Sequence, residues 1–380
     1  MSARGLALAA ILVLAAALRL YSLERVPLWL DEQCQLFVAQ SDSFHEFWRR
    51  SGDLGPIGRL SYVESWIVWH LGGHSLAWFR TPAVIWGVAA VAVTFVLGRR
   101  WFSGAAGLYA AALLSVCGIH IQFSREARGY ALLVLLALAW AWLLDRFARK
   151  MSWKVGTALL VLSVAGLEVH PVFWLPMAAL GASFSIAQFF NSEVPLRTRG
   201  IFVSAMVAIL LLAGICDHLL RLGMPYILPS IAVNTDPMSK TLIETYKAIA
   251  GGYWGVSSYV IFLAMLAGLA FAFREKTKRA AALCVLAIGI TAALPVVLGF
   301  HRGVAVYPRY SLFAAPFLFL AAGFGIEIGM RRAFKSERAH WILAVILPLA
   351  LLWGTYLQKR SPYDLENFKK SDPNWPQLSR

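Results

Sequence analysis

Eleven apolar runs constrain the fold of this chain more than any other feature of its sequence. A transmembrane helix needs about 20 mostly apolar residues, and the runs that reach or approach this length cover residues 6–22, 81–98, 104–122, 129–147, 154–168, 172–190, 199–219, 256–273, 280–300, 309–329 and 340–357. The composition agrees, since 59% of the 380 residues are hydrophobic and only 14% are charged, which is far from the balance of a soluble globular protein. The sequence therefore predicts an all-α polytopic membrane protein with about eleven transmembrane helices.

The net charge of +15 would suggest a nucleic-acid partner in a soluble chain, but the positions of the cations argue against this class. Most Lys and Arg residues lie in short connections between apolar runs, as they do in the cytoplasmic loops of membrane proteins. With a cytoplasmic N-terminus, every second connection is basic: Arg99 with Arg100, the stretch from Arg146 to Lys154, Arg197 with Arg199, the cluster from Arg274 to Arg279, and the stretch from Arg331 to Arg338. We therefore predict a cytoplasmic N-terminus, a lipid bilayer as the surroundings of the chain, and no bound nucleic acid.

The remaining connections fall on the outer side of the membrane and cover residues 23–80, 122–128, 168–171, 220–255, 301–308 and a tail from 358. We expect one transmembrane domain over 1–357, with 23–80 as its first outer loop, and a short outer tail over 358–380. The cations Lys359, Arg360, Lys369 and Lys370 in this tail depart from the charge rule. The first run fits either a signal peptide or an uncleaved anchor, and Arg19 with the acids that follow it favours the anchor.

The first outer loop is too long to be a simple connector and is rich in aromatic residues. Its segments FHEFWRR, from Phe44 to Arg50, and IGRLSYVESWIVWHL, from Ile57 to Leu71, alternate aromatic and charged residues at helical spacing. Helices of this kind lie in the plane of the membrane interface. We therefore predict interfacial helices in this loop.

Ionisable residues gather on the predicted outer face. They are Asp31, Glu32, Glu126, Arg128, Glu168, His170, His301, Arg302 and Arg309. Ionisable groups near membrane depth tend to mark a functional site, although loops also carry charges without a function and arginines at helix ends extend to lipid headgroups. A carboxylate there can deprotonate an acceptor hydroxyl while Arg or His holds a phosphate. Asp31 is the candidate base, because it opens the outer loop directly after a transmembrane run.

Several residues near this set have two interpretations. His170, in the corner LEVHPVF, fits either the site or a cap on its own corner. The tryptophans of the first outer loop fit sugar stacking or an aromatic belt at the interface. No cofactor is indicated, and a divalent metal stays open only through residues that meet in space, since the chain has no HExxH or CxxC spacing.

Three stretches resemble the GT-C glycosyltransferase superfamily. They are LRLYSLERVPLWLDE (residues 18–32), LGRRWFSGAAGLYAAALLSVCGIHIQFSREARGYALLVLLAL (97–138) and YPRYSLFAAPFLFLAAG (307–323). The similarity is greatest to bacterial members related to the protein O-mannosyltransferases, the aminoarabinose transferases and the RgtA/B/C/D-like transferases. It covers about half of the chain at the level of motifs.

This resemblance implies an enzyme of the bacterial inner membrane with its active site on the periplasmic or extracellular side. Such an enzyme transfers a sugar, with inversion, from a polyprenyl-phosphate donor to a glycan, lipid or protein acceptor. The family pattern makes Asp31 the catalytic base and gives Glu32 a supporting role. It also places donor-phosphate or substrate contacts at Glu126, Arg128, Tyr130, His170, His301, Arg302, Arg309 and Tyr310.

Two departures from the family leave other functions open. Many relatives have a His-Pro-Pro stretch where this chain has DLGPIGR, from Asp53 to Arg59, and many continue into an outer domain beyond the last helix. Acceptor recognition would then depend on loops or on a partner subunit. The alternatives are a transporter or flippase of lipid-linked sugars, which needs polar residues deep in several helices, and a catalytically degenerate partner subunit, against which the intact Asp-Glu pair argues.

Overall fold

The computed structural model describes residues 3–25, 27–54, 58–222, 237–250, 256–301, 307–334 and 336–357. Within these ranges the chain forms helices and no strands. Every apolar run of the sequence matches a helix or a pair of helices: α1 (Ala3–Leu20), α5 (Leu76–Trp101), α6 (Gly104–Ser115) with α7 (Gly118–Phe123), α8 (Tyr130–Arg149), α9 (Trp153–Val169), α10 (Trp174–Phe189), α11 (Leu196–Leu220), α13 (Val256–Arg274), α14 (Arg279–Thr291) with α15 (Leu294–His301), α16 (Ala315–Ala333) and α17 (Glu337–Leu357). The predicted all-α polytopic fold is confirmed.

Seven helical segments are long and apolar enough to cross a membrane by length and composition alone, among the described residues. Shorter apolar helices, such as Gly104–Ser115, complete the bundle. Short 3-10 helices also occur at the ends of three runs: η1 (Pro171–Phe173), η2 (Lys276–Lys278) and η3 (Pro308–Ala314). The protein is therefore a multi-pass membrane protein whose helices differ widely in length.

The run 104–122 breaks into α6 and α7 because a buried arginine binds the end of α6. Arg19 of α1 donates from Nη1 to the carbonyl oxygen of Ser115 at 3.1 Å, and its Nη2 lies 2.7 Å from Nδ1 of His120. The last carbonyls of a helix lack partners within the helix, and a cation is favoured at this end of the helix dipole. Arg19 is fully buried, so α1 is an integral part of the bundle at this point.

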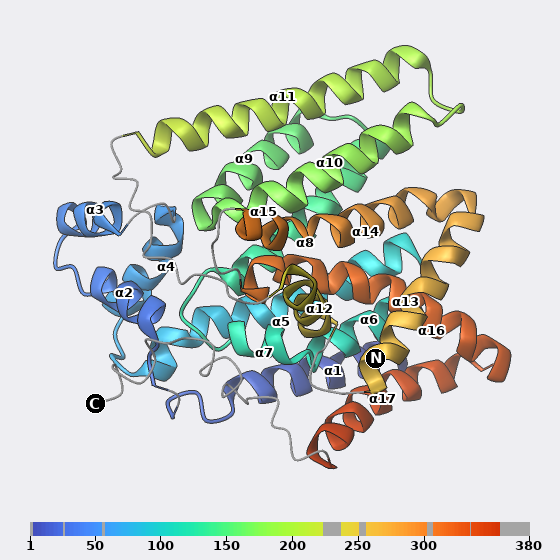
Figure 1. The fold of residues 1–380 in the computed structure, drawn as a ribbon, viewed down its shortest axis with the longest axis horizontal. Coiled ribbons are helices and arrows are strands. Elements are labelled where there is room, and N and C mark those ends of the chain that lie inside the picture. The colour runs from blue at the N-terminus through green and yellow to red at the C-terminus, as the bar shows by residue number, and fades with distance from the viewer. Residues whose placement is uncertain are drawn as a thin grey trace.

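The first outer loop folds into three short helices, α2 (Leu30–Ala39), α3 (Phe44–Asp53) and α4 (Arg59–His70). α3 and α4 lie where the sequence predicts helices, whereas α2 was not predicted. The buried side chains of Val38, Phe47 and Tyr62, one from each helix, form a small hydrophobic core. Figure 1 shows these three helices together at one end of the long bundle. Their placement in the membrane interface stays a prediction.

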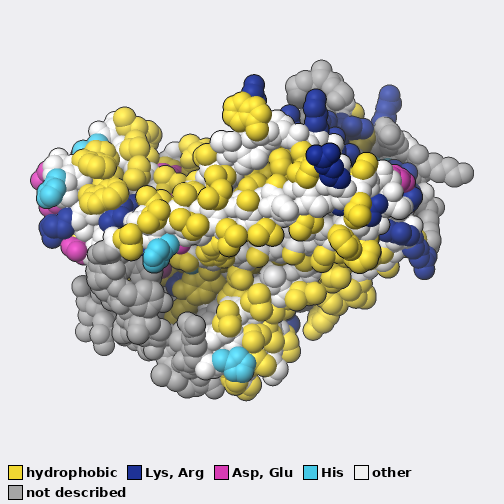
Figure 2. Space-filling model, turned by 90° about the horizontal axis from the view of Figure 1, so that it is seen from above, with side chains coloured by type: hydrophobic (Ala, Val, Ile, Leu, Met, Phe, Trp, Pro, Cys, Tyr) yellow, Lys and Arg dark blue, Asp and Glu magenta, His cyan; other side chains and the backbone are white. Residues whose placement is uncertain are grey.

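The two ends of the bundle differ in charge. Figure 2 shows most of the visible Lys and Arg side chains at the end away from α2, α3 and α4, with hydrophobic side chains over the middle of the same face. Two buried acids at the basic end have cationic partners: Asp145 binds Arg100 and Arg149, and Glu327 binds Arg331. When every second connection along a membrane protein is basic, its Lys and Arg side chains gather on one side of the membrane. The observed separation of charge agrees with this pattern.

A further helix, α12 (Met238–Ile249), lies in the connection 220–255. Its sequence alternates polar and apolar residues, and its buried positions are Thr245 and Ile249. It packs against η3, α15 and α7. The sequence analysis treated this segment only as an outer connection, so α12 is an addition from the structure.

Helices α13 and α16 approach each other closely at two glycines. A Cβ atom at Gly268 would lie 1.9 Å from the carbonyl oxygen of Ala321, and a Cβ atom at Gly325 would lie 1.9 Å from that of Ala264. Small residues allow helix backbones to approach closely within a membrane. The packing of α13 against α16 therefore requires residues without a Cβ atom at these two positions.

We expect Gly268→Ala and Gly325→Ala each to lower the free energy of unfolding by about 1–3 kcal/mol, because the new methyl group overlaps a backbone carbonyl. Thermal unfolding in detergent measures the effect. Gly329→Ala is the matched control, since no heavy atom lies within 4 Å of its Cβ position. Because alanine has a higher helix propensity than glycine, Gly329→Ala should not lower the free energy of unfolding. An equal decrease in all three variants would contradict the close crossing of α13 and α16.

Candidate active site

Asp31 lies in the first turn of α2, between two arginine side chains. Its Oδ2 is 3.6 Å from Nη2 of Arg128 and 3.8 Å from Nη2 of Arg309. The Asp31 side chain is 28% exposed, whereas those of Arg128 and Arg309 are 4% and 11% exposed. Both distances exceed those of charge-assisted hydrogen bonds, so the carboxylate is attracted by both cations and stays accessible to a substrate.

Arg309 lies inside a group of aromatic rings. η3 begins at Pro308, which places Arg309 at the start of this 3-10 helix. Its guanidinium carbon lies 4.8 Å from the ring centre of Trp29, 5.9 Å from Tyr130, 4.3 Å from Tyr307 and 5.4 Å from Tyr310. Such contacts are attractive and strengthen when the cation is desolvated. The rings orient the guanidinium and keep it weakly hydrated. Weak hydration favours the binding of a phosphate to this group.

Glu32 has a different environment from its neighbour Asp31. Arg80 of α5 donates to Glu32 from Nε at 2.8 Å and from Nη2 at 2.7 Å, and both side chains are 1% exposed. The Glu32 carboxylate also accepts a hydrogen bond from the backbone N–H of Ala127 at 2.8 Å. Arg80 in turn donates to the carbonyl oxygen of Leu23 at 2.8 Å. The Glu32 carboxylate is thus occupied by protein donors and fixes α2 against α5 and the turn before α8.

Glu126 lies in the same turn and is buried. Nε2 of Gln122 donates to its Oε1 at 3.2 Å, while its Oε2 has no hydrogen-bond partner among the described residues. Burial, followed by the charge of Glu32, raises the pKa of Glu126 to about 8. Glu126 is therefore mostly protonated at neutral pH, which leaves the two cations beside Asp31 with one negative charge between them and a net positive site.

His170 caps the corner between α9 and η1, as one of its two interpretations proposed. Its Nδ1 accepts the backbone N–H of Val172 at 3.1 Å, so its proton lies on Nε2. Its ring centre lies 5.5 Å from that of Tyr130 and 5.7 Å from that of Tyr310. Burial, followed by the charges of Arg128 and Arg309, lowers its pKa to about 3. A neutral His170 therefore packs between the tyrosines and does not carry a positive charge at physiological pH.

Eight of the ten residues that the family resemblance assigns to the site meet in this region: Asp31, Glu32, Glu126, Arg128, Tyr130, His170, Arg309 and Tyr310. His301 does not join them in the structure. It ends α15, is exposed, and its ring lies 6.3 Å from that of Phe300. Arg302 lies outside the described residues. Among those described, no group of three or more His, Cys, Asp and Glu residues could hold a metal ion.

Sequence analysis missed several residues of this region, among them Tyr307 beside Arg309, Arg80 and Gln35. Arg80 neutralises Glu32, and Gln35 accepts a hydrogen bond from Nη1 of Arg128 at 3.2 Å. Gln35 follows Asp31 by one helical turn, so both face Arg128 from the same side of α2. That spacing would have been informative if α2 had been recognised as a helix, whereas no local pattern indicates the partner of Arg80.

Comparison with known proteins agrees with the fold. The family model of dolichyl-phosphate-mannose-protein mannosyltransferases matches residues 62–216. No curated protein matches the chain by sequence. Among solved structures, ArnT from Cupriavidus metallidurans in the apo state is similar over 81% of this chain and 63% of its own, with a TM-score of 0.51 and 13% identity. The chain thus spans less than two thirds of the length of this relative.

Two further structures resemble the chain. ArnT from Cupriavidus metallidurans bound to undecaprenyl phosphate aligns with 92% of this chain and 71% of its own, at a TM-score of 0.57 and 14% identity. An oligosaccharyltransferase from Archaeoglobus fulgidus, in complex with zinc and sulfate, aligns with 97% of this chain and 56% of its own, at a TM-score of 0.59 and 13% identity. These similarities show that the chain shares the fold of these two proteins.

We expect Glu32→Gln to lower the free energy of unfolding by about 3–5 kcal/mol, because it leaves the Arg80 cation buried without a counter-charge. Thermal unfolding in detergent and gel filtration would detect this loss. Glu193→Gln is the control, since it removes an ion pair with Lys276 that is 70% and 72% exposed and contributes little. A Glu32→Gln protein as stable as the control would contradict the anchoring role of the pair.

Proposed function

We propose that the protein is a glycosyltransferase that moves a sugar from a polyprenyl-phosphate donor to an acceptor hydroxyl, with inversion and with Asp31 as the base. One observation carries this proposal. An accessible carboxylate lies within 4 Å of two nearly buried guanidinium groups, those of Arg128 and Arg309. This combines a proton acceptor and a binding site for a phosphate leaving group in one small region.

The reaction is a single displacement. Asp31 takes the proton of the acceptor hydroxyl while the oxygen of that hydroxyl forms a bond to the anomeric carbon. The bond between this carbon and the phosphate oxygen breaks, and its electron pair leaves with the polyprenyl phosphate. Arg128 and Arg309 stabilise the charge that develops on this phosphate. Attack opposite to the leaving group inverts the anomeric carbon, and Asp31 ends protonated.

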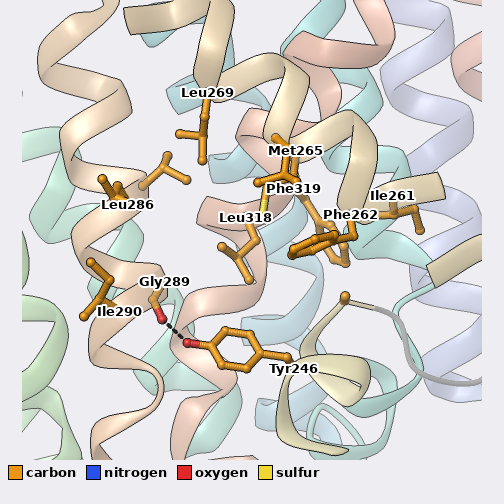
Figure 3. Close-up of a pocket in the computed structure, with 13 residues that line it drawn as sticks. Tyr246, Ile261, Phe262, Met265, Leu269, Leu286, Gly289, Ile290, Leu318 and Phe319 are labelled. Atoms are coloured by element: carbon orange, nitrogen blue, oxygen red, sulfur yellow. Dashed lines mark hydrogen bonds between the residues drawn. The ribbon is translucent and has the colours of Figure 1, made fainter. Parts of the chain in front are cut away.

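An apolar groove beside η3 fits the lipid part of the donor. It is formed by α12, α13, α14 and α16 and has a cavity volume of about 200 Å³. Figure 3 shows Leu269, Leu286 and Leu318 around it, with the hydroxyl of Tyr246 bound to the carbonyl oxygen of Gly289. Helix α12, which lines the groove, also packs on η3, which carries Arg309.

The charge distribution supports an active site on the outer face. Most of the visible Lys and Arg side chains lie at the end of the bundle away from α2, which carries Asp31, so the positive-inside rule favours a cytoplasmic N-terminus and a periplasmic or extracellular site. We propose a bacterial inner membrane as its location. The acceptor is a glycan, a lipid or a protein, and a partner subunit is compatible with its recognition.

We expect Asp31→Asn to reduce sugar transfer by at least about 100-fold, since it removes the general base, while the protein keeps its fold. Lipid and polysaccharide extracts from cells with the wild-type chain, without it, or with Asp31→Asn would be compared by mass spectrometry. A species lost equally in the last two identifies the product. Glu193→Gln, which alters an exposed carboxylate paired with Lys276, is the control and should retain the product.

A product that disappears with the deletion but persists with Asp31→Asn would contradict the catalytic role of Asp31. A flippase or a partner subunit would then explain the loss. Purified Asp31→Asn should also bind undecaprenyl phosphate, because both arginines remain. Failure of this binding in a folded protein would count against the assigned phosphate site.

We expect Leu269→Trp to raise the KM for a long-chain polyprenyl donor by roughly tenfold and to leave kcat within a factor of two, because it fills the groove and not the reacting region. Transfer assays with long and short prenyl chains would show the effect only for the long chain. Leu211→Trp is the control, since Leu211 is an exposed apolar residue of α11 outside the groove. An equal effect on both chain lengths would argue against a tail in this groove.

A further inference from the structure

Gln35 is a buried amide that connects the arginine beside Asp31 with helix α4. The side chain belongs to α2, and the residue is 1% exposed. Its Oε1 accepts a hydrogen bond from Nη1 of Arg128 at 3.2 Å. Its Nε2 donates to the carbonyl oxygen of Ser61 at 2.5 Å and lies 3.0 Å from Oγ of Ser65. Arg128 is thereby joined to α4 through one amide group.

The two ends of this amide cannot be exchanged. An arginine side chain only donates hydrogen bonds, and a backbone carbonyl only accepts them. Arg128 therefore requires the amide oxygen of Gln35, and the carbonyl of Ser61 requires the amide nitrogen. Because both partners select the same orientation, the amide is a fixed support for one end of the guanidinium.

The groups that hold Arg128 from the side of α4 are uncharged. Gln35 is neutral, and Tyr62 of α4 is a second neutral neighbour. Burial raises the pKa of the Tyr62 hydroxyl, and the charge of Arg128 acts against this rise, so the two side chains lie close together. The other end of the guanidinium lies 3.6 Å from Oδ2 of Asp31. Helix α4 and Gln35 therefore fix Arg128 without cancelling its charge.

Arg80 shows the opposite arrangement a short distance away. It donates to the carboxylate of Glu32 at 2.8 and 2.7 Å, and both side chains are 1% exposed. A carboxylate at this distance offsets the charge of the guanidinium, so this pair serves as an anchor. An arginine held by an amide keeps its attraction for an anionic ligand, and this attraction is strong in a site with little water.

We propose that Gln35 is a positioning residue for Arg128, which directs the guanidinium at Asp31 and the donor phosphate and leaves its charge available to both. This inference rests on the proposed function. Transfer converts the phosphodiester of the donor into a phosphate monoester with more negative charge, and the net positive charge of the site favours this change. The neutrality of Gln35 is therefore as important as its hydrogen bonds.

Gln35→Glu tests the neutrality, because it replaces one nitrogen atom by oxygen and adds a negative charge beside Arg128. We expect it to weaken the binding of undecaprenyl phosphate to the purified protein by at least about tenfold, since the added charge cancels the net positive charge of the site. Titration calorimetry in detergent measures this affinity. Affinity equal to that of the wild type would overturn the inference.

Gln35→Met tests the orientation, because it keeps the length and the neutrality of the side chain and removes its hydrogen bonds. We expect undecaprenyl phosphate to bind within about threefold of the wild type, since the charge of Arg128 is unchanged. The amount of product in cell extracts, per amount of folded protein, should fall about tenfold, because Arg128 is no longer held in position. Transfer equal to that of the wild type would contradict the positioning role.

Gln188→Glu is the matched control. Nε2 of Gln188 on α10 also donates to a backbone carbonyl, that of Ala148 at 3.3 Å, but it does so away from the site. This variant should follow the wild type in binding and in transfer. Gel filtration and thermal unfolding give the folded fraction of each variant, and Gln35→Met decides the question if Gln35→Glu does not fold.

The pattern of the two Gln35 variants separates positioning from a merely structural role. A structural role would lower the folded fraction of both variants and leave the affinity and the transfer of the folded protein unchanged, which would overturn the inference. Normal binding and transfer in Gln35→Glu would leave the proposed function intact. A wild-type protein that neither binds undecaprenyl phosphate nor forms a product would overturn the proposed function, and the inference would fail with it.

Discussion

The ion pair between Glu32 and Arg80 fixes the position of the first outer loop on the bundle. It joins α2 to α5, and its hydrogen bonds also reach the backbone at Leu23 and Ala127. A buried ion pair overcomes its desolvation cost only when the geometry is close and the other polar atoms are satisfied. Both conditions hold here. Slippage of α2 by one residue would separate the pair, so the register of α2 is strongly constrained.

This constraint explains how two adjacent acids acquire different tasks. Neighbouring residues on a helix point about 100° apart, since one turn takes about 3.6 residues. With Glu32 directed inward to Arg80, Asp31 faces Arg128 and Arg309 and stays 28% exposed. The anchoring acid, Glu32, and the proposed base, Asp31, therefore depend on each other, because the orientation of Asp31 follows from the burial of Glu32.

Much of the fold follows from local sequence, whereas the partners in the site do not. The apolar runs predict the transmembrane helices because length and hydrophobicity alone decide them. Helix α2 escaped prediction because its sequence, LDEQCQLFVA, lacks a clear apolar period. The pairing of Glu32 with Arg80 spans 48 residues and that of Arg309 with Asp31 far more, so only the folded chain reveals them. The break after α6 likewise depends on Arg19, a residue of another helix.

The two arginines beside Asp31 have unlike surroundings, and this difference assigns a direction to the proposed reaction. Arg309 lies among aromatic rings on η3, next to α12 and the apolar groove. Arg128 contacts polar groups of α2 and the cavity beneath α4. In the proposed reaction the lipid donor would approach from the groove, with its phosphate at Arg309. Inversion requires the acceptor to come from the opposite side, and the face formed by α2 and α4 is the one that remains. The acceptor would thus reach Asp31 over the first outer loop. The DLGPIGR stretch of this loop departs from the family pattern. We therefore expect differences in this loop to set acceptor choice, while the donor side stays alike among related enzymes.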